Sequence, residues 1–264
     1  MQSWSGTMAL VLVTGAVGWL LYEGSRGRVG RRAFAGGLVL GVPAAVAQSR
    51  LLVAAMAMPL NRTLVPYLVI YVLLAWSGLS LSARAGFPGL ALWPRSLADA
   101  PGDGRPREGL VLTGLLAGVA LGAALGGLNF ALIRWNRAVG IPWPVWFTPL
   151  RGHPSLIALM SAQAALTEEI TFRLFLFPAV AVLLGRLGRL GSSGLSPRGS
   201  APPAWAVVAG LAAQAVLFGA IHGLPGLALG VASGAALGVV AYFFGIETCM
   251  VAHLLGDLLS WGFA

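Results

Sequence analysis

The chain has 264 residues, of which 58% are hydrophobic and only 9% are charged. This composition excludes an ordinary soluble globular domain and indicates a polytopic membrane protein. The net charge of +9 comes from 17 basic residues, all of them arginine. Because most of them lie in the loops between apolar segments, they favour contact with anionic lipid headgroups over nucleic-acid binding.

Eight apolar segments approach the roughly 20 residues that a membrane-spanning helix needs. In chain order they cover residues 7–22, 33–59, 63–83, 109–133, 153–184, 204–223, 225–245 and 247–263. We therefore predict an all-α fold, a polytopic membrane helix bundle of about eight transmembrane helices. The second segment is interrupted by Pro43 and by the polar residues 48–50, so it can form one bent helix or a re-entrant pair. The first segment lacks a basic leader and a small-residue cleavage site, which favours a retained span over a signal peptide.

Arginines concentrate in alternate loops. They follow the first, third and fifth segments, at positions 26, 28, 31, 32, 84, 95, 105, 107, 186, 189 and 198. The positive-inside rule then places these loops in the cytoplasm and both chain termini outside. Residues 84–108 and 191–203 are interpreted as irregular connections, and residues 143–146 as an aromatic belt at one membrane interface.

The stretch of residues 167–173 (TEEITFR) carries three ionisable side chains within an apolar run. Charged groups are costly at bilayer depth and mark functional sites there. On an α-helix, Glu169 and Arg173 lie one turn apart on the same face, whereas Glu168 points in a different direction. We expect Arg173 to neutralise Glu169 and to leave Glu168 without a local partner.

Two further polar patches follow in later helices. Gln214, Phe218 and His222 form one stripe at helical spacing, and His253 and Asp257 lie one turn apart on one face. Each patch alone could be a hydrogen bond between helices. Three patches within about ninety residues of one membrane protein indicate a functional site.

The remaining candidates are interpreted as structural. His153 opens a helix as an interfacial polar residue, and Cys249, the single cysteine, is a small buried side chain that cannot form an intrachain disulfide. We divide the chain into residues 1–150, which carry no motif, and residues 151–264, which carry all three patches.

The order EExxxR, FxxxH and HxxxN/D in successive C-terminal helices resembles the CPBP (CAAX protease and bacteriocin-processing, or Abi) family of intramembrane proteases. This family includes the Ras-converting CAAX endopeptidases and myxosortase-like bacterial members. The resemblance covers roughly residues 150–264 and implies that these are catalytic helices. It also implies an endopeptidase that cuts a membrane-anchored protein or peptide near its C-terminus or membrane anchor.

Carried over by position, the resemblance makes Glu168 the general base that activates water, with His222 sharing that role. His253 and Asp257 would stabilise the oxyanion, while Glu169 and Arg173 would form a supporting ion pair. The family pattern favours Asn at position 257 and admits Asp. Because an ionised Asp257 cannot donate a hydrogen bond, it would instead orient His253 and favour its protonated form.

Two alternatives remain open. Glu168, His222, His253 and Asp257 are suitable zinc ligands, although no HExxH motif is present, so the cofactor is either none or zinc. A non-catalytic transporter or immunity protein of the same fold would also contain buried acids and histidines. The abundance of Arg, Ala and Gly suggests a bacterial source, and with it an inner-membrane location.

Overall fold

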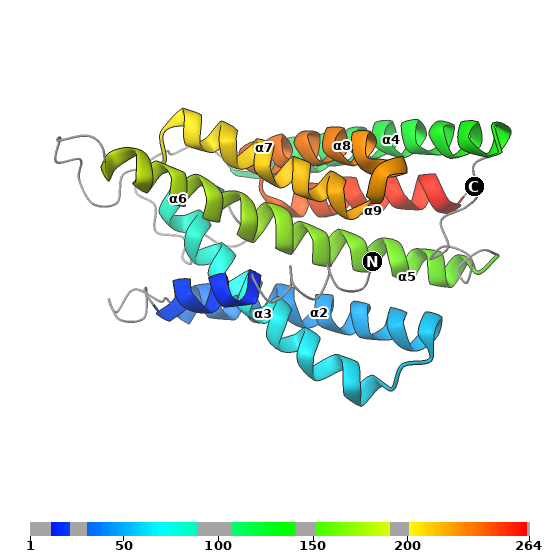
Figure 1. Cartoon of the computed structure of the whole chain (residues 1–264), viewed down its shortest axis with the longest axis horizontal. Coiled ribbons are helices and arrows are strands. Elements are labelled where there is room, and N and C mark those ends of the chain that lie inside the picture. Colours follow the sequence, from blue (N-terminus) through cyan, green and yellow to red (C-terminus); the bar gives the residue numbers. More distant parts are fainter. Residues whose placement is uncertain (1–11, 22–30, 89–106, 141–151, 191–200, 263–264) are drawn as a thin grey trace.

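The computed structural model describes residues 12–21, 31–88, 107–140, 152–190 and 201–262. Every regular element in these ranges is a helix, as the apolar segments predict. A short apolar helix, Leu12–Leu21, comes first. It is followed by α2 (Arg31–Met56), α3 (Leu60–Ala85), α4 (Arg107–Ala138), α5 (Pro154–Glu168), the π-helical segment η3 (Glu169–Leu176), α6 (Phe177–Leu190), α7 (Ala204–Ile221), α8 (Gly223–Phe244) and α9 (Ile246–Gly262) (Figure 1).

Six helical segments within the described ranges are long and apolar enough to cross a membrane, which makes the chain an integral membrane protein. The two outermost predicted segments contain shorter helices, Leu12–Leu21 and the 17-residue α9. The ambiguous second segment is one helix, since α2 continues through Pro43.

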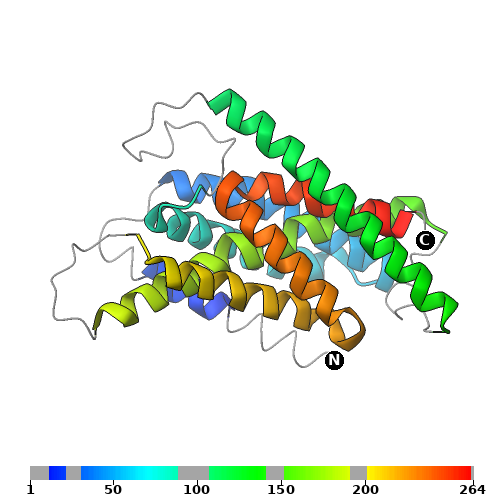
Figure 2. The ribbon, with the colours of Figure 1, turned by 90° about the horizontal axis from the view of Figure 1, so that it is seen from above.

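One continuous rod, formed by α5, η3 and α6, runs through the middle of the bundle (Figure 1). The α2/α3 pair lies on one side of it, and α4, α7, α8 and α9 lie on the other. Figure 2 shows that α4 and α8 cross the other helices obliquely. The segment η3 contacts α3, α7, α8 and α9, so the acidic stretch predicted to carry the chemistry lies at the centre of the fold.

Close backbone approach holds α3 against the central rod. Ile170, Leu174 and Phe175 are buried among the apolar side chains of α3. A Cβ added at Gly78 of α3 would lie 2.6 Å from the Leu174 carbonyl oxygen. Because lipid is as apolar as the helix surfaces, such steric fit, rather than expulsion of water, stabilises helix pairs in a membrane.

Two predicted cytoplasmic ends meet in the structure. The guanidinium groups of Arg84, at the end of α3, and Arg186, in α6, lie 5.8 and 5.1 Å from the ring of Trp19. This contact agrees with the assignment of both arginines to the same side. The predicted aromatic belt at residues 143–146 and most of the predicted linkers lie outside the described residues.

The two residues interpreted as structural behave as expected. His153 is exposed at the start of α5. Cys249 is fully buried in α9, and its Sγ donates a hydrogen bond to the carbonyl oxygen of Leu237 at 3.0 Å.

A row of glycines holds α4 against α9. A Cβ at Gly114, Gly118, Gly122 or Gly126 would lie between 2.6 and 2.9 Å from an atom of α9. Each of these distances is shorter than van der Waals contact, so a larger side chain would push the helices apart. The glycine row thus fixes the position of α9, the helix that carries His253 and Asp257.

We expect Gly122→Ala to destabilise the protein by about 1–3 kcal/mol through overpacking. The added methyl group would lie 2.6 Å from the rigid backbone oxygen of Ala252. Gly127→Ala is the matched control, because no atom lies within 4 Å of its added Cβ. Thermal unfolding of both variants in the same detergent measures the difference. Equal midpoints would show that α4 and α9 do not depend on this contact.

Candidate active site

The helix changes its geometry within the acidic stretch. Glu168 is the last residue of α5, and the wider π-helical turns begin at Glu169. Next to this change, the Thr171 hydroxyl donates to the Thr167 carbonyl oxygen at 2.7 Å. Segments of π-helix inside α-helices frequently occur at functional sites, because they alter which side chains share a face.

The imidazole of His253 lies between three carboxylates. Its Nδ1 is 2.7 Å from Glu169 Oε1, and its Nε2 is 3.8 Å from both Glu168 Oε2 and Asp257 Oδ2. The Glu169 side chain is fully buried, whereas 23% of the Glu168 side chain and 19% of the Asp257 side chain are exposed. Nδ1 therefore faces the interior of the bundle, and Nε2 faces the accessible side of the cluster.

This arrangement adds two contacts that the sequence did not indicate. Although Glu168 and Glu169 leave the helix in different directions, they lie at the two nitrogens of one imidazole. A ring that carries nitrogens on both edges can meet two neighbouring side chains that leave the helix in different directions. Asp257 Oδ2 lies 3.8 Å from His253 Nε2, and the short hydrogen bond to the imidazole is made by Glu169, in another helix.

The predicted ion pair between Glu169 and Arg173 is confirmed. Arg173 Nη1 lies 3.1 Å from Glu169 Oε1, and both side chains are fully buried. The contact is a close ion pair and not an aligned hydrogen bond: within the described part of the chain, none of the three guanidinium nitrogens has a hydrogen-bond partner. Glu169 Oε1 thus joins the guanidinium to the imidazole.

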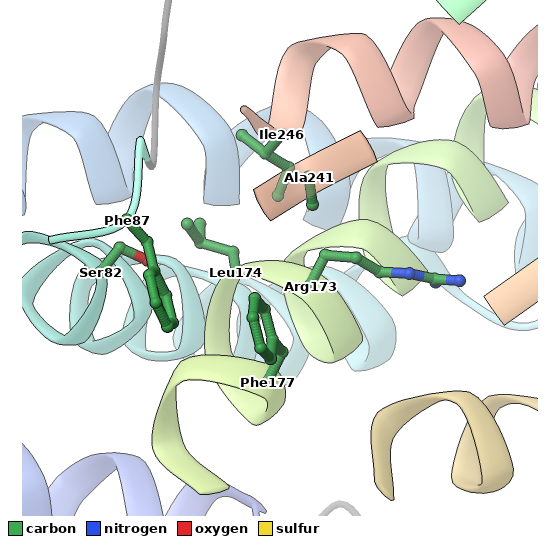
Figure 3. Close-up of a pocket in the computed structure, with 7 residues that line it drawn as sticks. All are labelled: Ser82, Phe87, Arg173, Leu174, Phe177, Ala241 and Ile246. Atoms are coloured by element: carbon green, nitrogen blue, oxygen red, sulfur yellow. The ribbon is translucent and has the colours of Figure 1, made fainter. Parts of the chain in front are cut away.

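The Phe218 ring contacts this charged group through its face. The Arg173 guanidinium carbon lies 4.0 Å from the centre of the Phe218 ring, a cation–π contact. Arg173 also lines a pocket together with Ser82, Phe87, Leu174, Phe177, Ala241 and Ile246. Figure 3 shows its guanidinium pointing away from the other six residues. The ring replaces some of the polar neighbours that the buried cation lacks.

The same phenylalanine brings the two candidate histidines to one level. The Phe218 ring centre is 6.0 Å from that of His253 and 4.8 Å from that of His222. In the predicted segments 204–223 and 247–263, His222 lies near one end of its helix and His253 about two turns from the opposite side of the membrane, so these bounds place the two histidines at different depths. Two features remove the conflict: α8 crosses the bundle obliquely, and α7 ends at Ile221, immediately before His222 (Figure 2).

His222 is exposed at the junction of α7 and α8, and its Nδ1 lies 2.7 Å from the Phe218 carbonyl oxygen. The Nδ1–H donates in this contact, so Nε2 remains for another partner. Gln214, the third member of the predicted stripe, is fully buried and donates to the Gly234 carbonyl oxygen at 2.8 Å. It joins α7 to α8 and has no part in the histidine cluster.

Sequence reasoning missed two contacts of the site. These are the hydrogen bond between Glu169 and His253, 84 positions apart, and the cation–π contact between Arg173 and Phe218. The i,i+4 spacing within each helix was visible, but no pattern in one sequence shows which faces of two helices meet.

The described residues contain no preformed site for the zinc ion of the alternative mechanism. Among the described residues, no group of three or more His, Cys, Asp or Glu side chains is arranged to hold a metal ion. Glu168, His222, His253 and Asp257 therefore do not form a ligand set in this conformation.

Comparison with known proteins finds a family model that matches the C-terminal part of the chain. The family model described as type II CAAX prenyl endopeptidase Rce1-like matches residues 151–259. This range includes Glu168, Glu169, Arg173, His222, His253 and Asp257, and leaves out α2, α3 and α4. No curated protein and no solved structure matches the chain.

Removal of Arg173 tests the buried ion pair. We expect Arg173→Met to lower the free energy of unfolding by about 3–5 kcal/mol, because it leaves the Glu169 carboxylate buried without its cation. Arg134→Met, an exposed position on α4, serves as the control and should cost less than about 1 kcal/mol. Unfolding midpoints in detergent measure both. If the two variants unfold alike, the pair does not stabilise the fold.

Proposed function

Residues 151–259 match the family model of Rce1-like type II CAAX prenyl endopeptidases, a family of proteases, and from this match we propose that the chain cuts peptides. In our proposal it is an intramembrane endopeptidase in which Glu168 activates the attacking water. The observation that carries the proposal is the position of His253 Nε2, 3.8 Å from carboxylate oxygens of two partly exposed side chains, Glu168 and Asp257, while Nδ1 is held in the interior.

Glu168 has the properties of a general base. Its side chain is 23% exposed, and its Oε2 is buried and has no hydrogen-bond partner in the described structure. The 3.8 Å separation from His253 Nε2 is too long for a direct hydrogen bond and suits a bridging water. A water bound there can lose a proton to Glu168 as its oxygen attacks the peptide carbonyl carbon.

His253 then stabilises the developing charge. The attack converts the carbonyl oxygen into an oxyanion, and the protonated imidazole can donate Nε2–H to it. Glu169 orients the ring by accepting Nδ1–H, just as a carboxylate orients the histidine of a hydrolase triad. Glu168 returns its proton to the amide nitrogen as the carbon–nitrogen bond breaks, so the two products are a carboxylic acid and an amine.

His222 and Asp257 complete the proposed site. Asp257 favours the protonated form of His253, because its negative charge lies 3.8 Å from Nε2. His222 approaches the cluster across the Phe218 ring, with Nε2 available to share in proton transfer or to bind the substrate carbonyl.

The substrate of such a site is a protein or peptide held at the membrane. Glu168 and Asp257 are only partly exposed, and they lie within helices of a membrane bundle. A substrate segment must therefore enter the bundle in an extended form. We propose cleavage near a C-terminus or a membrane anchor, in the inner membrane of a bacterium. The residues do not favour a particular sequence at the cut.

Glu168→Gln tests the proposed base. We expect cleavage to fall by about 10²–10⁴-fold, because the amide cannot take the proton of water. Membrane proteomics of the native host would compare wild type, Glu168→Gln and Glu168→Ala for proteins whose C-termini change. The control is Glu247→Gln, the same chemical change near the start of α9, which should keep wild-type cleavage. Wild-type C-termini in both Glu168 variants would refute the assignment.

Metal removal tests the zinc alternative. We expect purified protein treated with a chelator, and shown by elemental analysis to be free of zinc, to keep its cleavage rate within about twofold, because the proposed water activation uses a carboxylate. Loss of cleavage on chelation, together with recovery on adding zinc, would favour the metalloprotease.

A further inference from the structure

A polar network joins the N-terminal helices to the helix that carries Glu168. Gln163 Nε2 of α5 donates to Gln48 Oε1 of α2 and to Thr167 Oγ1, both at 2.7 Å. The Tyr71 hydroxyl of α3 lies 3.5 Å from the same Gln48 Oε1 and donates to it. Three helices therefore meet at hydrogen-bonding side chains within an apolar bundle.

Two members of the network each make two hydrogen bonds. Both protons of the Gln163 amide nitrogen are used, and Gln48 Oε1 accepts from two donors. Thr167 is 3% exposed, and its carbonyl oxygen also accepts from the Thr171 hydroxyl. Satisfied networks in surroundings of low dielectric constant are rigid, because moving one member leaves a buried polar group unpaired. Both the side chain and the carbonyl of Thr167 are thus held in place.

Thr167 immediately precedes Glu168, whose own carboxylate is weakly held. In the described structure Glu168 Oε2 has no hydrogen-bond partner, and its nearest cationic partner, His253 Nε2, lies 3.8 Å away. The direction of the Glu168 side chain therefore depends on its backbone. That backbone lies at the change from α to π geometry, between Glu168 and Glu169.

We propose that Gln48 and Tyr71 are positioning residues that hold the Thr167 turn and so aim the Glu168 carboxylate at the reacting water. Both belong to α2 and α3, outside the matched residues 151–259. This inference rests on the proposed protease function and assigns the N-terminal helices a part in catalysis. A network that only joins helices would affect stability and leave the turnover of the folded enzyme unchanged.

Tyr71→Phe and Gln48→Leu remove one hydroxyl and one acceptor from the network. Tyr67→Phe is the matched control: Tyr67 is one turn earlier on α3, and its ring stacks on that of Tyr71 at 6.0 Å. We expect each network variant to lower kcat by about 10- to 100-fold with KM within about twofold, because misplacing a catalytic group affects the chemical step. The double variant should have a kcat only slightly lower than that of either single variant, since both changes break the same network.

Hydrogen exchange of the backbone amides in residues 163–176 gives a readout that does not need activity. We expect faster exchange in Tyr71→Phe and Gln48→Leu than in Tyr67→Phe and wild type. The two proposals can fail separately. If the wild type cuts no substrate, the protease function is refuted, and with it the catalytic role of Gln48 and Tyr71. Faster exchange in the two network variants would in that case still show that the network holds the Thr167 turn. Unchanged exchange, wild-type kcat or a rise in KM alone would each overturn the positioning role.

Discussion

The buried contact between Glu169 and His253 is the interaction on which the rest of the site depends. It joins the central rod to α9 at 2.7 Å, with the carboxylate fully buried. A carboxylate in that position is tolerated only when its charge is compensated, which Arg173 does at 3.1 Å. The Arg173 guanidinium nitrogens lack hydrogen-bond partners in the described structure, and the face of the Phe218 ring stabilises this cation instead. Three helical segments, η3, α7 and α9, are thereby held together around one imidazole.

Steric fit gives this polar centre its rigid frame. The glycines of α4 let α9 approach to backbone contact, and Gly230 of α8 lies so close to α7 that a Cβ there would be 2.7 Å from Gly219 Cα. Helices packed at such distances cannot slide without collisions between backbones. The 3.8 Å distances around His253 Nε2 therefore depend on small residues far from the charged groups.

The two glutamates show how neighbouring residues acquire different chemistry. Glu169 is enclosed with a cation and a histidine, which suits orientation and charge balance. Glu168 is partly exposed and lacks a short contact, which suits proton transfer to and from water. The polar network of α2, α3 and α5 lies on the Thr167 side of the pair, so both halves of the chain meet at the change of helix geometry.

The sequence alone determined the all-helical membrane fold, the Glu169–Arg173 pair and the candidate residues, because apolar length and i,i+4 spacing are local properties. It could not determine that Glu169 rather than Asp257 makes the short bond to His253, nor that His222 and His253 share the Phe218 ring. The π-helical turn at Glu169 and the oblique path of α8 were also invisible (Figure 2). These features depend on which helix faces meet, and only packing of the whole bundle decides that.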